Sequence, residues 1–276
     1  MKVDEPLFSA LPYRPEILRD KNLYAIGHPD LVPVLKKLAE EKDLDLPGQS
    51  QVIKEHPNLI VQTSLLRDND FPWPRQVIKQ FRWRGIQNYL ASPLKKSKAI
   101  KSYLAACHLL KHGLGTPMPL GAVEVRSCGF VRENLYLTEE VKDPINLLQL
   151  LKKTPHGEDN AREVVRQLAE YVLRMHDSGL WHRDLNITNF LLQGTPGKWR
   201  LYLLDLNRAI KMPHLPSPLR AHELSRLKLK KWPEVFFEYY CMDRFSRDKM
   251  LNTARKIRSL RRKWRDRLGL VRGDSG

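Results

Sequence analysis

The sequence predicts an α+β protein of two lobes, in which a small β-rich lobe precedes a larger helical lobe. Three observations predict this: short alternating apolar runs within residues 51–81, an amphipathic pattern over residues 161–176, and two short apolar runs after the polar loop that follows it. A chain of 276 residues is long for one hydrophobic core and suits two lobes. We place the hinge near residues 139–146 and expect four segments: an N-terminal extension (1–47), the first lobe (48–141), the second lobe (142–243) and a basic amphipathic C-terminal segment (244–276).

The first lobe is expected to begin with a hairpin. Residues 51–55 and 59–63 alternate in polarity and are joined by His56-Pro57-Asn58. A further strand is expected over 75–81, followed by a helix over 97–111 that stops at a run of glycine and proline. Two more strands, 120–126 and 134–138, complete the lobe and lead into Glu139-Glu140-Val141. In the extension we expect only a short helix, over 31–41.

The second lobe is expected to begin with the helix over 161–176, which ends at Asp177-Ser178-Gly179. A polar loop follows, then a strand over 189–192, a turn, and a strand over 199–204 that ends on Asp205. Prolines stiffen the chain before a helix expected over residues 220–232. Its polar edge is a candidate to meet a substrate.

The polar loop, residues 182–189, carries the strongest chemical pattern, because it reads His-Arg-Asp-Leu-Asn-Ile-Thr-Asn. At this spacing Asp184 would accept a proton from an attacking hydroxyl, while Asn189 and Asp205 would hold metal ions that neutralise a triphosphate. A His-Arg-Asp triplet alone can also be a salt bridge at a strand end. The order of helix, loop, strand, turn and strand around it favours phosphoryl transfer over that structural interpretation.

A single cation, Lys79, lies in the middle of the strand expected over 75–81. It is the candidate phosphate-binding lysine. The alternative interpretation is a lysine that only faces water from an alternating strand.

Over residues 48–225 the chain resembles the protein-kinase-like superfamily and, more narrowly, the bacterial lipopolysaccharide core heptose/Kdo kinases. The resemblance rests on residues 97–103, 113–120, 182–189 and 205–209. It implies a two-lobed protein-kinase-like fold and an ATP- and Mg²⁺-dependent kinase. Such enzymes phosphorylate a heptose or Kdo hydroxyl of the lipopolysaccharide inner core, at the cytoplasmic face of the inner membrane.

The resemblance also implies roles for individual residues. Asp184 would be the catalytic base, and Asn189 and Asp205 would bind Mg²⁺. Lys79 would contact the ATP phosphates. The remaining nucleotide contacts would come from the backbone of Glu139 and Val141 beside adenine and from Leu191 beneath its ring.

Several departures from the protein-kinase pattern leave other functions open. No Gly-x-Gly-x-x-Gly run precedes Lys79, and the helix over 97–111 lacks the usual acidic partner for that lysine, a role for which Glu124 is a candidate. Asp205 is followed by Leu-Asn rather than Phe-Gly, no Ala-Pro-Glu follows, and Asn186 stands where protein Ser/Thr kinases commonly carry lysine. The alternatives are an atypical protein Ser/Thr kinase, which Asn186 disfavours, and a pseudokinase scaffold at a membrane, which retention of Asp184, Asn189 and Asp205 disfavours.

Charge is the second informative feature, since the chain carries a formal net charge of +17 and more than half of it lies near the C-terminus. Residues 244–272 hold twelve Lys and Arg against two Asp, with apolar residues at helical spacing. We expect a basic amphipathic helix that packs through its apolar stripe and attracts an anionic membrane surface. Nucleic acid is the competing partner, but the sequence contains no recognisable nucleic-acid-binding module.

The sequence shows neither a disulfide or zinc spacing among its three cysteines nor an apolar run long enough to span a bilayer. It also lacks a secretory signal pattern in its first thirty residues. We therefore expect a cytoplasmic protein that is soluble or peripheral on the inner membrane. The sequence leaves the oligomeric state open, and a monomer or a weakly associated protein is expected.

Overall fold

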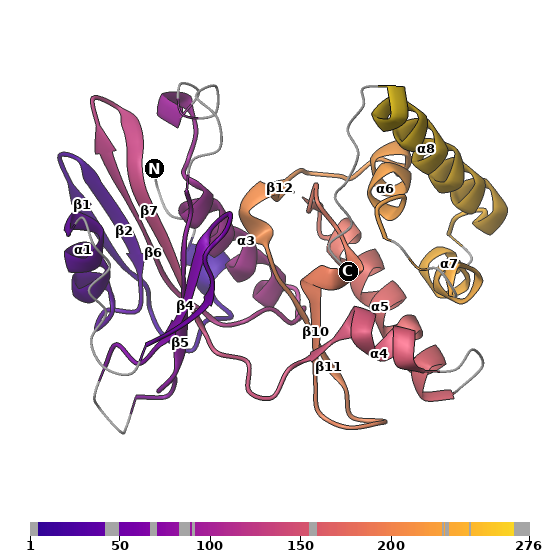
Figure 1. Cartoon of the computed structure of the whole chain (residues 1–276), viewed down its shortest axis with the longest axis horizontal. Coiled ribbons are helices and arrows are strands. Elements are labelled where there is room, and N and C mark those ends of the chain that lie inside the picture. The colour runs from indigo at the N-terminus through magenta and orange to yellow at the C-terminus, as the bar shows by residue number, and fades with distance from the viewer. Residues whose placement is uncertain are drawn as a thin grey trace. The chain divides into compact units, whose positions relative to one another are not determined.

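The chain folds into two compact units of mixed helix and sheet (Figure 1). The first comprises Met1–Pro144 and Tyr202–Ala209, and the second comprises Ile145–Leu201 and Ile210–Gly276. Residues 202–209 belong to the first unit. We had predicted them to be part of the second lobe. The computed structural model describes residues 5–41, 50–66, 71–82, 89, 92–154, 159–227, 229, 232–242 and 244–267.

The first unit is built on a seven-stranded sheet, in which every neighbouring pair of strands is antiparallel. The strand order is β1-β2-β6-β7-β5-β4-β3. The strands are β1 (Glu16–Asp20), β2 (Leu23–Gly27), β3 (Gln51–Lys54), β4 (Leu59–Thr63), β5 (Gln76–Gln80), β6 (Pro119–Ser127) and β7 (Phe130–Glu139).

The predicted hairpin and the predicted strands of this unit are present, with ends that differ by a few residues. The segment predicted as an N-terminal extension contributes two further strands, β1 and β2, which we did not predict. These strands pair with each other, and β2 pairs with β6. The N-terminal segment is therefore one edge of the sheet.

Helices α1 (Val32–Glu40) and α3 (Lys98–Lys111) cover opposite faces of the sheet (Figure 1). Strand alternation explains the two faces. On β7, Leu135 and Leu137 point into the cluster that contains α1, whereas Tyr136 between them points into the cluster that contains α3. Since Lys79 of β5 pairs directly with Tyr136, it projects from the α3 face.

Short 3₁₀ turns complete the unit: η1 (Glu5–Phe8), η2 (Ser92–Leu94) and η4 (Leu206–Arg208). The last of these packs against α3. This contact brings the residue before η4, Asp205, to the same sheet face as Lys79.

The second unit contains the two longest described helices, α5 and α8, and its strands belong to a three-stranded sheet of order β11-β10-β8 and a two-stranded sheet of β12 and β9. Its helices are α4 (Leu147–Lys153), α5 (Asp159–Asp177), α6 (Ser217–Leu224), α7 (Pro233–Cys241) and α8 (Arg247–Arg267), and η3 (Ile187–Asn189) is a 3₁₀ turn. Strand β10 (Phe190–Gln193) pairs with β8 (Ile145–Asn146), and β9 (Leu180–Trp181) pairs with β12 (Ile210–Lys211). Strand β11 (Arg200–Leu203) follows β10, and the chain enters the first unit within it.

Two predictions about this unit are adjusted. The helix expected over residues 220–232 is wrong at both ends, because α6 spans Ser217–Leu224 and Ser225 and Arg226 form a turn after it. Lys228, Lys230 and Lys231 lie outside the described residues. The basic helix is present as α8, and the first part of its stripe is buried through Met250, Leu251 and Ala254. Within the described ranges, no helix combines the length and apolar character needed to cross a bilayer.

Candidate active site

The candidate catalytic loop is entered through a tight glycine turn. Helix α5 ends at Asp177, and Gly179 follows in the left-handed conformation with φ of 79°. A Cβ at this position would lie 2.0 Å from the carbonyl oxygen of Met212, so only glycine fits. The Gly179 carbonyl accepts a hydrogen bond from the Met212 N–H at 2.8 Å, which joins the loop to β12.

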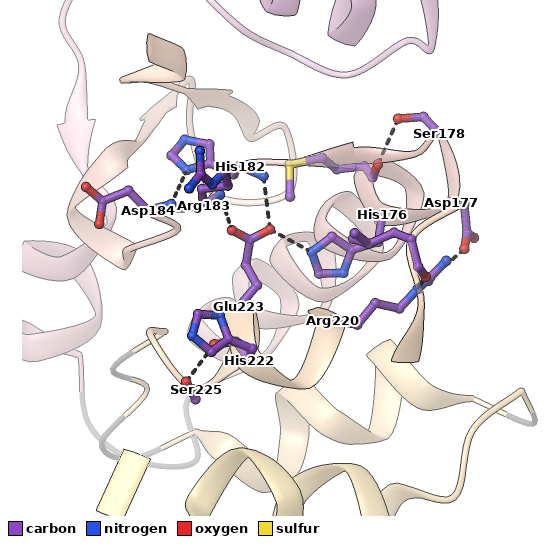
Figure 2. A network of polar contacts seen from close by, with 12 residues as sticks. His176, Asp177, Ser178, His182, Arg183, Asp184, Arg220, His222, Glu223 and Ser225 are labelled. Carbon is purple, nitrogen blue, oxygen red and sulfur yellow. Dashed lines mark hydrogen bonds and ion pairs between the residues drawn. The ribbon is translucent and has the colours of Figure 1, made fainter. Parts of the chain in front are cut away.

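A buried carboxylate, Glu223 of α6, holds the start of the loop (Figure 2). One of its oxygens accepts the backbone N–H of His182 at 3.1 Å, and the other accepts the backbone N–H of Arg183. The first oxygen also contacts Nε2 of His176 at 3.2 Å, and Nδ1 of His176 lies 2.7 Å from the Tyr240 hydroxyl. Side chains of α5, α6 and α7 thus fix the backbone of the two residues that precede Asp184.

Burial and hydrogen bonding decide the charges in this network. Burial opposes ionisation of Glu223, but the hydrogen bonds from His176 and the loop outweigh it and hold the carboxyl pKa below its ordinary value. Burial holds the pKa of His176 below 6.5, with Glu223 opposing this shift. The consistent arrangement is a neutral imidazole that donates from Nε2 to an ionised Glu223 and accepts the Tyr240 O–H at Nδ1.

The loop places Asp184 at a partly exposed position, where its Oδ1 accepts a hydrogen bond from Arg226 at 2.7 Å. Its backbone N–H donates to Nδ1 of the buried His182 at 3.3 Å. Asn189 donates from Nδ2 to the Asp184 carbonyl at 3.2 Å, so its amide oxygen remains as the acceptor end. Asn186 caps η3 by accepting the Thr188 N–H, which leaves its amide N–H groups as the donors.

In the first unit, Lys79 and Asp205 form an ion pair with Nζ to Oδ1 at 2.6 Å, although 126 positions separate them in the sequence. Lys79 also lies 5.1 Å from the centroid of the Phe81 ring. Asp205 has φ of 60° and ψ of 48°, a left-handed conformation that aspartate tolerates better than most residues. The side chain of Asn207 donates to the same carboxylate oxygen.

Glu124, the candidate partner for Lys79, is engaged elsewhere. Its Oε2 accepts the Ser97 N–H at 2.9 Å, and its Oε1 accepts from Arg126 at 2.8 Å. Asp205 takes the acidic role beside Lys79 instead. Lys79 therefore pairs with a carboxylate although α3, the helix that follows its strand, contains no Asp or Glu.

The segment expected to contact a nucleotide base lies at the end of β7. The N–H groups of Glu139 and Glu140 donate to the carbonyls of Met118 and Arg75, at 3.0 Å each. Burial raises the pKa of the Glu139 carboxyl, although that carboxyl accepts the Met118 N–H. In the second unit, Leu191 is partly buried on β10 opposite Asn146.

The two candidate metal ligands supply the chemistry that Mg²⁺ prefers, a carboxylate from Asp205 and an amide oxygen from Asn189. Among the described residues, no group of three or more His, Cys, Asp or Glu is arranged to hold a metal ion. Each unit thus offers one oxygen donor of the kind that Mg²⁺ takes, and the chemistry of each donor, considered by itself, fits that ion.

Sequence reasoning missed the residues that position the loop, Glu223, His176 and Tyr240. We had considered the helix that carries Glu223 only for a polar edge that could meet a substrate. No local pattern marks these residues, because their contacts join α5, α6, α7 and the loop across 41 to 64 positions.

Comparison with known proteins places the chain in a family. Residues 77–240, more than half of the chain, match the model of the Lipopolysaccharide kinase (Kdo/WaaP) family, and the protein belongs to that family. The match begins two residues before Lys79 and includes the whole loop and Asp205.

Curated relatives named 3-deoxy-D-manno-octulosonic acid kinase show the same similarity. The protein of Vibrio parahaemolyticus is 26% identical over 46% of this chain and 50% of its own length. That of Actinobacillus succinogenes is 31% identical over 44% of this chain and 48% of its own length. The match thus spans about half the length of these relatives. Among solved structures, "WaaP in complex with acyl carrier protein" is similar in fold, with a TM-score of 0.57, 20% identity, and coverage of 85% of this chain and 96% of that one.

Proposed function

We propose that the protein is an ATP- and Mg²⁺-dependent kinase that phosphorylates a sugar hydroxyl, of heptose or Kdo, in the lipopolysaccharide inner core. The observation that carries the proposal is the 2.6 Å pair of Lys79 and Asp205. We selected these residues separately, one as a phosphate contact and one as a metal ligand, and the fold brings them together. Family membership and the names of the curated relatives support a sugar acceptor.

In this mechanism, Asp184 accepts the proton of the attacking sugar hydroxyl while the sugar oxygen bonds to the terminal phosphorus. The bond from that phosphorus to the bridging oxygen breaks, and ADP leaves with the electron pair. Lys79 contacts the phosphates, and Asn189 and Asp205 would each supply an oxygen ligand to Mg²⁺. When bound, the metal neutralises charge on the phosphates.

The base and the ring of the nucleotide are assigned to three residues. The Glu139 carbonyl and the Val141 N–H bind the adenine edge, since the N–H groups of Glu139 and Glu140 already donate within the sheet. Leu191 supplies an apolar surface for the ring. The Asn186 amide orients a phosphate or a sugar hydroxyl.

The test is transfer of the terminal phosphate of ATP to dephosphorylated inner-core lipopolysaccharide, with and without Mg²⁺. The wild-type protein is compared with the Asp184→Asn and Asp205→Asn variants. The matched control is Asp248→Asn, on the exposed first turn of α8. We expect both site variants to lose about 10²- to 10⁴-fold in rate and the control to keep its rate.

Two other outcomes would replace the proposal. Labelling of a generic protein acceptor without labelling of the glycolipid would indicate an atypical protein kinase. ATP or membrane binding that survives both substitutions, with no transfer to any acceptor, would indicate a non-catalytic scaffold.

We also propose that α8 brings the protein to an anionic membrane, at the cytoplasmic face of the inner membrane. The exposed end of its apolar stripe supports this, because Leu260 is 48% exposed and Trp264 is 61% exposed while the start of the stripe is buried. Basic residues surround them along the helix. Each basic residue near an anionic surface contributes about 1 kcal/mol.

Vesicle co-sedimentation tests the membrane proposal. We expect binding to vesicles with anionic lipid, weak binding to zwitterionic vesicles, and loss on Trp264→Ala or at high salt. Equal binding to both vesicle types would refute it.

A further inference from the structure

We infer that Arg226 binds a carboxylate of the sugar acceptor and determines specificity for acidic sugars. This inference rests on the proposed function and goes beyond it by assigning the acceptor's anionic group to one side chain. The starting observation is the contact between the Arg226 guanidinium and Asp184, in which Nη1 lies 2.7 Å from Oδ1. An acceptor whose hydroxyl reaches Asp184 therefore also comes within reach of Arg226.

The structure holds Arg226 firmly in the turn after α6. Its backbone N–H donates to the Glu223 carbonyl at 2.9 Å. Arg258 of α8 donates to the carbonyls on both sides, from Nε to Ser225 at 2.9 Å and from Nη2 to Leu227 at 2.6 Å. Such anchoring exceeds what a solvent-exposed arginine needs and suits a side chain that must present a fixed surface to a ligand.

The guanidinium has capacity for a second anion. Nη1 donates to Asp184, and Nε is buried without a hydrogen-bond partner, so a second anion would reach the outer N–H groups of the guanidinium rather than Nε. The side chain is 24% exposed, so part of the fork can be reached from solvent. A carboxylate is the planar two-oxygen group that matches an arginine fork.

The surrounding charge favours an anion at this position. Groups that face the turn from neighbouring elements include His222 of α6 and Arg258 and Arg261 of α8. Burial and then the charges of Arg261 and Arg226 lower the pKa of His222, which shows that positive charge accumulates here. Glu223, another acidic group near this turn, already accepts hydrogen bonds from His176 and from the backbone of the loop.

The Arg226–Asp184 contact also divides the work between the two side chains. Arg226 would contact the carboxylate of the acceptor, while Asp184 receives the proton of the acceptor hydroxyl.

The experiment uses two acceptor analogues, the methyl glycoside of 3-deoxy-octulosonic acid and its carboxamide. Calorimetric binding and phosphoryl transfer are measured for the wild-type protein, Arg226→Gln, and the matched control Arg200→Gln at the exposed start of β11. We expect wild-type protein to bind the acid about 10- to 100-fold more tightly than the carboxamide, the range for one charge-assisted hydrogen-bonded pair. Arg226→Gln should lose this preference through KM, with little further loss on the carboxamide, and the control should retain it.

Equal binding of acid and carboxamide by wild-type protein would overturn the inference. So would an equal loss of kcat on both analogues in Arg226→Gln with KM unchanged, because Arg226 would then only position Asp184. The experiment separates this inference from the proposed function. If the proposed function is wrong, the wild-type protein transfers no phosphate to either analogue, and the binding measurements still decide the role of Arg226. If Arg226→Gln does not fold, Arg226→Lys tests the same preference with the charge kept and the fork removed.

Discussion

Replacing Glu223 by Gln should both destabilise the protein and slow the reaction. The carboxylate accepts hydrogen bonds from His176, His182 and Arg183, with two donors on one oxygen and one on the other. An amide has a single oxygen. Whichever way it lies, its NH₂ group faces at least one N–H donor inside a fully buried site.

The cost can be worked from that geometry. Losing one hydrogen bond to a charged acceptor costs about 1.5–3 kcal/mol of stability. The NH₂ group of the new glutamine and the N–H group that it faces are both buried donors without an acceptor, which adds about 1–3 kcal/mol. We therefore expect Glu223→Gln to lower the free energy of unfolding by about 3–5 kcal/mol. The loop that carries Asp184 loses a fixed contact, so kcat should fall about 10-fold or more while KM for ATP stays within about twofold.

Urea denaturation and steady-state kinetics measure these effects. The matched control is Glu163→Gln on α5, whose carboxylate pairs with Arg166 at the surface and contributes only about 0.3–0.5 kcal/mol. The reasoning is refuted if Glu223→Gln costs no more than Glu163→Gln, or if a folded Glu223→Gln protein keeps the wild-type kcat.

Three further predictions concern other contacts. The urea midpoint should fall as the pH drops from 7 to 5, because His176 takes up a proton near pH 6.5 in the unfolded chain but resists it in the folded state. It should fall again below about pH 4.5, because Glu223 has a lowered pKa in the folded state and is protonated first in the unfolded chain. A midpoint that stays constant over this range would contradict the assigned charges. Lys79→Met should reduce kcat/KM for ATP about 10- to 100-fold in steady-state assays yet change the unfolding free energy by under about 1 kcal/mol, since its partner Asp205 is 36% exposed; unchanged kinetics would exclude the phosphate role. Ser97→Ala should cost about 1 kcal/mol in urea denaturation through loss of the α3 cap, and a cost near zero would show that the cap is dispensable.

The sequence allowed prediction of elements whose own residues specify them. The strand of Lys79, the helix after Ser97 and the helix before the loop each combine a strong periodicity with a recognisable start or stop. Strands β1 and β2 escaped because β1 is an exposed edge strand with little alternation, and its pairing is defined only against β2.

For the site, the sequence indicated candidate residues but not their partners. Loop spacing identified Asp184 and Asn189 without reference to the rest of the chain. Their supports are long-range contacts, from Glu223 to the loop and from Arg226 to Asp184, and depend on how α6 packs. Such contacts have no local periodicity, so a single sequence contains no pattern from which to predict them.

Helix α3 contains no Asp or Glu and therefore offers no carboxylate to Lys79. In the first unit the sheet holds this helix through its N-terminus: Glu124 accepts the Ser97 N–H, and Asn134 accepts the Ala99 N–H at 3.2 Å. Lys79 obtains its carboxylate from Asp205 and not from the helix. Because α3 supplies no carboxylate to Lys79, a movement of this helix would not break an ion pair between the helix and the lysine. Its remaining link to the Lys79–Asp205 pair is its packing against η4, the turn that follows Asp205.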